Sequence, residues 1–172
     1  MATIEGKRLV TVRTTTALEA VGAYSAETVL SNSDTPGAGV DWDFDAVGKV
    51  NGGTGYIVKA QAISETTAKT PRLTLFLFNA APTCELDDQA ANTALLHADL
   101  SKYIGKIDFP AMEDLGTGDS EAVASPSTYG NLPLAFNCAS DNDALYGVLV
   151  TRDAVTFGAG DDMTLVLTCE QY

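Results

Sequence analysis

Three aspartates at alternate positions, Asp41, Asp43 and Asp45, are the residues of this chain that come closest to a metal-binding pattern. Their spacing is that of the first ligands in a helix-loop-helix calcium site. The motif then stops, because alanine occupies its sixth position, where glycine is needed, and glycine its twelfth, where a glutamate is needed. Since aromatic residues separate the aspartates, the pattern favours the solvent-facing side of a β-strand, with weak calcium binding by turn aspartates as the lesser alternative.

Other residues with catalytic or ligand-binding potential are too few or too scattered to form a site. His97 is the only histidine, so one subunit cannot build a triad or a multi-histidine metal site. Cys84, Cys138 and Cys169 have no C-x-x-C spacing, and we interpret them as reduced residues of the core. The glycines of 52–55 lack the Lys-Ser/Thr ending of a phosphate-binding loop and indicate a turn. We therefore predict no catalytic residue, no cofactor and no metal, and hence no enzyme.

The net charge of the chain limits the kinds of partner that it can bind. Ten Lys and Arg against 23 Asp and Glu give a net charge of −13, which repels nucleic acid phosphates and anionic lipid head groups. No apolar run is long enough for a signal peptide or a membrane span, so we expect folding in a cytoplasm. Three of the few cations, Lys7, Arg8 and Arg13, cluster near the N-terminus, where they could pair with carboxylates of a partner or guard an edge strand against aggregation.

The elements that would position these residues read as short β-strands. The final strand is the clearest, because Met163, Leu165, Leu167 and Cys169 alternate with more polar residues almost to the C-terminus. Residues 73–78 are apolar on both faces, which indicates a central strand covered on each side or one that meets a partner subunit. About eight such runs separated by Gly, Pro, Asn and Asp predict an all-β, two-sheet sandwich with Greek-key connections, preferably a jelly roll.

The sequence also allows more specific predictions for individual segments. We expect residues 1–20 to form an N-terminal arm or edge strand and residues 21–172 the sandwich domain. In the strand at 56–64 we expect Tyr56, Val58, Ala60 and Ala62 to face the core. Residues 17–23 and 85–99 are compatible with helix, and a helical turn is expected over 99–103, with Asp99 as its N-cap. Residues 110–133 are expected to be one long connection.

Several segments resemble the capsid decoration, or cement, proteins of tailed bacteriophages. The likeness spans about residues 53–172 and is carried by these runs: Leu75-Phe76-Leu77-Phe78-Asn79-Ala80-Ala81-Pro82-Thr83, Ile107-Asp108-Phe109-Pro110-Ala111, Tyr129-Gly130-Asn131-Leu132-Pro133-Leu134 and Leu145-Tyr146-Gly147-Val148-Leu149-Val150-Thr151. The resemblance implies a jelly-roll-like sandwich, often trimeric, that sits on the outer face of the assembled virion head.

Such a protein ties neighbouring major capsid subunits together and has no enzyme activity. The resemblance thus implies a structural virion protein, made in the host cytoplasm, whose partners are the major capsid protein and its own copies, with a trimer expected. Lys7, Arg8 and Arg13 are the expected capsid contacts. The alternative is a carbohydrate-binding sandwich, lectin-like or a receptor-binding head fibre, in which Trp42 and tyrosines such as Tyr24, Tyr129 and Tyr172 stack on sugar rings.

Overall fold

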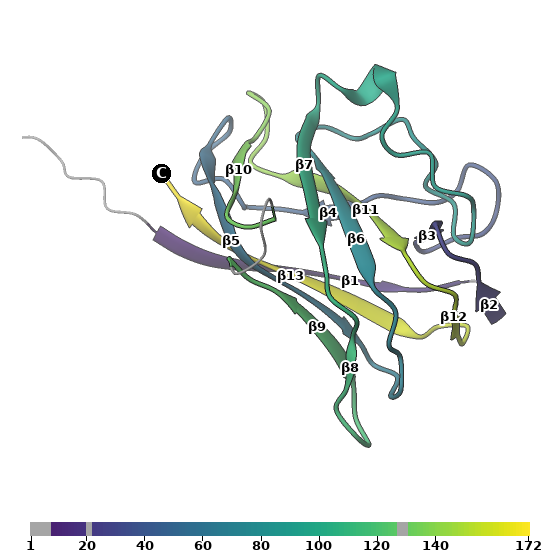
Figure 1. Cartoon of the computed structure of the whole chain (residues 1–172). Helices are drawn as coiled ribbons and strands as arrows, with labels where there is room; N and C mark the ends of the chain where they lie inside the picture. Colours follow the sequence, from purple (N-terminus) through teal and green to yellow (C-terminus); the bar gives the residue numbers. More distant parts are fainter. Residues whose placement is uncertain (1–7, 20–21, 127–130) are drawn as a thin grey trace, which may run out of the picture.

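The computed structural model describes residues 8–19, 22–126 and 131–172, and its regular structure there is almost entirely β-strand (Figure 1). The two main sheets are antiparallel and enclose one core. Sheet I has the order β1 (Arg8–Ala17), β13 (Asp162–Gln171), β5 (Thr54–Ser64), β9 (Ser120–Ala124) and β8 (Glu113–Asp114), with β10 (Leu134–Asn137) also paired to β5. The expected all-β sandwich is confirmed.

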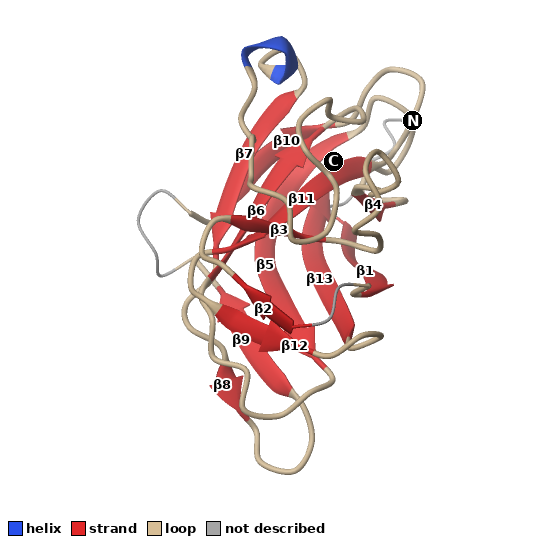
Figure 2. Ribbon diagram, turned by 90° about the vertical axis from the view of Figure 1, so that its right-hand side faces the viewer, coloured by secondary structure: helices blue, strands red, loops and turns tan. Residues whose placement is uncertain are grey.

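Sheet II faces the first sheet and is made of shorter strands. Its order is β3 (Thr28–Leu30), β11 (Leu145–Thr151), β6 (Leu73–Phe78) and β7 (Tyr103–Asp108), with β4 (Trp42–Phe44) also paired to β11. A separate pair joins β2 (Gly22–Tyr24) to β12 (Val155–Phe157). Figure 2 shows that β8 and the 3₁₀ turn η1 (His97–Asp99) lie at opposite ends of the molecule.

Strand β13 provides the centre of sheet I. It lies between β1 and β5 and is hydrogen-bonded along most of its length on both sides. The side chains predicted to face inward, Met163, Leu165, Leu167 and Cys169, are all fully buried. The predicted last strand is therefore confirmed, and the final segment of the chain is held by pairing with two segments that are distant in sequence.

The expected core face of β5 is only half correct, because the strand contains an irregularity. Lys59 pairs with Thr168, whereas Ile57 pairs with Cys169, so Val58 is an extra residue in the ladder. A bulge of this kind exchanges the two faces of a strand on one side of it. Ile57 consequently joins Ala60 in the core, and Tyr56 is turned to the solvent face.

The outer face of sheet II is covered by the chain itself. All six residues of β6 are buried, as predicted for a strand covered on both sides. Their outward members belong to a second apolar cluster beneath residues 79–102, which we call the strap. This cluster contains Val29, Phe76, Phe78, Cys84, Val148 and Val150, with Leu86, Ala94, Leu95, Leu96, Tyr103 and Tyr146 packed at its margin. Sheet II is thus enclosed without a partner subunit.

The strap is held by a buried aspartate, and the expected helical turn there is wrong. Asp99 accepts hydrogen bonds from the Thr83 amide at 3.0 Å and the Cys84 amide at 3.1 Å, while Lys102 lies 3.4 Å away. Burial opposes its charge, but the bonds from Thr83 and Lys102 keep the pKa of Asp99 below its usual value. Asp99 therefore bonds to a distant loop instead of capping a helix over 99–103. The compatible helix over 85–99 is absent apart from η1.

Two further expectations about chain segments need correction. The described part of 110–133 is not one long connection, because β8 and β9 extend sheet I there beside β5. No helix forms among the described residues of 17–23, where β1 ends and β2 begins. Residues 8–17 form the expected edge strand, β1, which is an integral part of sheet I.

Gly55 tests how closely β5 and β13 approach. A Cβ at this position would lie 2.2 Å from the Glu170 carbonyl oxygen and 2.6 Å from the Phe136 ring. We expect Gly55→Ala to reduce the free energy of unfolding by about 1–3 kcal/mol, because the strands must separate to admit the methyl group. Urea denaturation measures the loss, and Gly118→Ala is the matched control, since a Cβ there meets nothing within 4 Å. Equal stability of the two variants would contradict the proposed close approach.

Candidate functional site

The outer face of sheet I, unlike that of sheet II, has no described layer over it, and we call it the open face. One end of it carries the exposed side chains of Leu9 on β1 and Tyr56 on β5, on either side of Glu170, because Leu9 pairs with Glu170 and Glu170 pairs with Tyr56. Leu9 is 64% exposed and Tyr56 42% exposed. The ring of Tyr172 meets that of Tyr56 edge-on, with centroids 5.9 Å apart. Exposed tyrosines and aliphatic residues grouped in this way are typical of protein interfaces.

Two cations extend the open face beyond these side chains. Arg13 lies on β1 opposite Val166, and Lys59 lies on β5 opposite Thr168. Neither forms an ion pair with any residue that the structure describes. These cations share the open face with the carboxylates of Glu170 and Glu121, so an attraction for a partner's carboxylates is local to Arg13 on the edge strand.

The three predicted contact cations are not brought together as one cluster. Lys7 lies outside the described residues. Arg8 and Arg13 are both exposed on β1, but an even and an odd position of a strand project to opposite faces, and only Arg13 joins the open face. The alternation in 56–64 placed Lys59 on the face away from the core, as found, but sequence reasoning did not single it out as a contact, because its pairing with β13 joins segments distant in sequence.

The backbone of β1 has one unpaired side. The Leu18 amide donates to the Asp161 carbonyl at 3.1 Å, and the Leu18 carbonyl accepts from the Gly160 amide at 2.8 Å. Leu18 therefore faces β13, and the register from Ala17 back to Arg8 is unbroken. Because backbone groups alternate in direction along an antiparallel strand, even-numbered residues bond to β13 and odd-numbered residues point to the edge. No backbone bond reaches that edge from another described residue.

The aromatic residues expected to stack on sugars are mostly unsuitable. Trp42 is 2% exposed, and its indole nitrogen donates to the Leu30 carbonyl at 2.9 Å. Tyr24 is buried, and its hydroxyl donates to Asp88 at 2.6 Å. A role for Trp42 or Tyr24 as a stacking surface is therefore wrong, because both rings are core. Tyr129 lies outside the described residues, and Tyr172 is exposed.

The aspartates at alternate positions lie in β4 or directly beside it, and the predicted strand is present. Asp43 is exposed between the buried rings of Trp42 and Phe44. Burial, followed by the charges of Asp45 and Asp41, raises the pKa of Asp43. Within the described ranges, no group of three or more His, Cys, Asp or Glu side chains is arranged to hold a metal ion.

The cysteines lie in the core, as predicted. Cys84, Cys138 and Cys169 are free and buried. Burial raises the pKa of the first two thiols to about 11 and that of Cys169 to about 12. His97 is exposed in η1.

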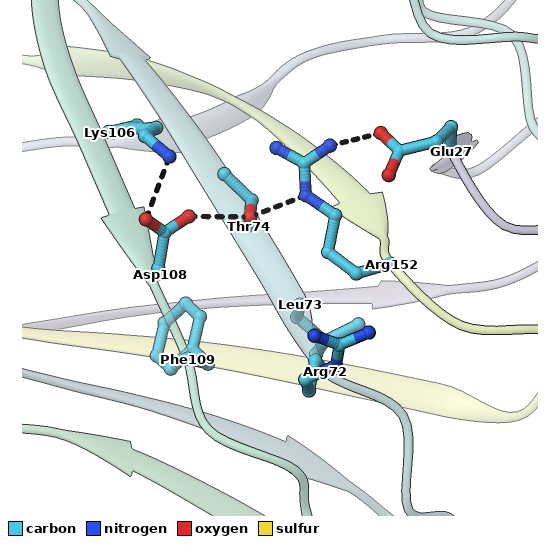
Figure 3. A pocket seen from close by; sticks show the side chains of 8 residues that line it. All are labelled: Glu27, Arg72, Leu73, Thr74, Lys106, Asp108, Phe109 and Arg152. Atoms are coloured by element: carbon cyan, nitrogen blue, oxygen red, sulfur yellow. Dashed lines mark hydrogen bonds and ion pairs between the residues drawn. The ribbon is translucent and has the colours of Figure 1, made fainter.

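Sequence reasoning also missed a charged cleft of about 330 Å³ at the end of sheet II that the strap leaves uncovered (Figure 3). The buried Thr74 hydroxyl links its two halves, donating to Asp108 at 2.8 Å and accepting from Arg152 Nε at 2.8 Å. Arg152 also pairs with Glu27, and Lys106 with Asp108 at 2.7 Å.

The cleft is better explained as a structural junction than as an anion site. Each of its cations already has a carboxylate partner. Besides the two pairs just described, Arg72 donates to Asp153 through two nitrogens at 2.7 and 3.0 Å. Burial opposes the charge of Asp108, but Lys106 and Thr74 keep its pKa below the usual value. The network ties β6, β7 and β11 to the turn before β3 and leaves no surplus positive charge. The only sequence signal for this network is that its arginines stand next to the ends of predicted strands.

Comparison with protein-family models, with curated proteins and with solved structures finds no match to this chain. None of the helices in the described ranges has the length and apolarity required to cross a membrane.

Thr74→Val tests the junction in the cleft. Loss of the hydroxyl leaves Asp108 and Arg152 each short of one bond, so we expect the free energy of unfolding to fall by about 1 kcal/mol. The pKa of Asp108 should rise toward its ordinary value, because a bond to its charged form is lost. Denaturation and a carboxyl NMR titration measure the two effects, with the exposed Thr156→Val as control. An unchanged Asp108 pKa would contradict the bridging role of Thr74.

Proposed function

We propose that this protein is a non-enzymatic capsid decoration protein of a tailed bacteriophage, which binds the outer surface of the assembled head and links neighbouring major capsid subunits. The observation that carries the proposal is the open face, where exposed Leu9 and Tyr56 lie on the same side of sheet I as Arg13, which has no ion pair with a described residue. The sequence resemblance of residues 53–172 supports it independently. The virion is then the site of action.

The strand order supports the jelly-roll version of the fold. The first strand lies beside the last in sheet I, and the chain passes between the two sheets from β4 to β5 and from β5 to β6. Crossings of this kind produce the double Greek key of a jelly roll. The three long strands β1, β13 and β5 give sheet I a broad outer face for contact with a protein shell.

Shell binding explains how modest contacts are sufficient. In a homo-oligomer, for which a trimer is the expected form, several copies of the open face bind together and their effects multiply. Because such an oligomer binds the assembled shell better than free subunits, it stabilises the shell by mass action. The same arrangement needs no catalytic group.

Arg13→Glu is the direct test on purified heads. Reversing this charge should repel capsid carboxylates, and we expect occupancy at limiting protein concentration to fall by about tenfold or more, since each 1.4 kcal/mol is tenfold and repeated contacts add. Point variants are preferable to deletion of residues 1–16, because β1 pairs with β13 along its whole length. Occupancy is measured by sedimentation of heads with bound protein.

Lys69→Glu is the control for charge, because it also replaces a cation with a carboxylate; the contacts that it removes are with the Thr156 carbonyl and the Phe157 ring of β12, away from β1. It should bind heads like the unmodified chain, while denaturation curves confirm that both variants are folded. Full occupancy by Arg13→Glu would remove the open face from the mechanism. Failure of the unmodified chain to bind any head would overturn the proposed function.

Carbohydrate binding is the second candidate, supported by the exposed edge-on pair of Tyr56 and Tyr172. Aromatic rings at a surface can stack on sugars. A glycan array with the unmodified chain and Tyr56→Ala distinguishes the two candidates. Under the capsid proposal, neither protein gives a specific signal. A specific signal that disappears in Tyr56→Ala would favour the carbohydrate-binding function.

A further inference from the structure

The free edge of β1 is long and presents a regular series of backbone groups. The strand has ten residues, and its odd-numbered positions direct their amide and carbonyl groups away from β13. These positions are Leu9, Thr11, Arg13, Thr15 and Ala17. A row of unpaired backbone groups on a straight strand is a template for another strand, unless the protein blocks it.

No described strand is hydrogen-bonded to this edge, although β4 of the facing sheet lies close to β1. The edge carries no proline, and its register with β13 is free of bulges. No loop among the described residues forms backbone bonds to it either. Its protection is the charge of Arg8 and Arg13, which deters some partners and attracts others.

The charges decide between a second copy and a different partner. Pairing β1 with the β1 of another copy would place the arginines of both chains on neighbouring strands of one sheet. Like charges on neighbouring strands are destabilising. A partner strand with carboxylates would instead meet Arg13 on the open face with opposite charge.

We propose that β1 binds an extended acidic segment of the capsid partner as an additional strand of sheet I. Main-chain bonds from the odd-numbered residues supply the affinity, and carboxylates at alternate positions of the segment lie beside Arg13 and supply the specificity. This inference rests on the proposed function, because it specifies how the same face contacts the shell.

Proline substitutions separate the backbone edge from the side chains. Thr11→Pro and Thr15→Pro each remove one amide that points to the free edge, whereas the backbone ladder to β13 remains, so the fold should persist. Thr15→Pro also removes the hydroxyl hydrogen bond to Thr164, so Thr15→Val is its control. We expect binding to heads to weaken by about tenfold for either variant, the effect of about 1.4 kcal/mol. Thr11→Val keeps the amide and should bind like the unmodified chain. Val12→Pro removes a bond to β13 and should instead unfold the strand.

Hydrogen exchange on the unmodified chain gives a readout that does not depend on a variant folding. The amides of Thr11, Arg13 and Thr15 should exchange rapidly in the free protein and become protected on heads. A second probe is a ten-residue peptide of alternating Thr and Glu, compared with the same peptide carrying Lys in place of Glu. Only the Glu peptide should protect these amides.

The outcomes separate this inference from the proposed function. Loss of head binding in Arg13→Glu without any amide protection, on heads or with the Glu peptide, overturns strand addition and leaves the proposed function standing. Protection by the Glu peptide without head binding supports the acidic strand and overturns the capsid function. Equal protection by the Lys peptide overturns the acidic partner. Protection in the free protein together with a dimer in solution would assign the edge to a second copy.

Discussion

The structure depends on the double pairing of β13, which joins the beginning, the middle and the end of the chain in one sheet. Its inward residues, from Met163 to Cys169, are fully buried, and its outward residues lie between those of β1 and β5. Sheet I can therefore form only when segments separated by more than a hundred residues have met. Such long-range pairing makes the sandwich cooperative, because no single strand can leave without exposing the core.

The two outer faces of the sandwich differ because the chain covers only one of them. The strap encloses Phe76, Phe78 and Val148, and it is held in place by the carboxylate of Asp99. The charged cleft lies where the cover by the strap ends, and its three cations are already paired with carboxylates. The outer face of sheet I has no such cover from the described chain, and Arg13 and Lys59 on it have no described ion pair. The asymmetry connects the fold to the proposed binding role.

Regular alternation was a reliable guide wherever a strand was straight. It correctly placed β13, and the two-sided apolar character of Leu73–Phe78 correctly indicated cover on both faces. It failed at β5, where the extra residue Val58 turns Tyr56 outward. It also failed at Asp99, whose partners Thr83 and Cys84 come from a distant loop, and at β8 and β9, whose short sequences have weak patterns.

By itself, the sequence determined the fold class, the buried faces of the straight strands and the scarcity of residues for catalysis, because a period of two and residue counts are local properties. Only the tertiary structure decided that Trp42 is core, that Arg8 and Arg13 project to opposite faces and that Lys59 shares the open face with Arg13. These facts follow from the register in which the strands pair and from the order of the strands in each sheet. Both are set by contacts between distant segments, where a shift of one residue reverses every side chain.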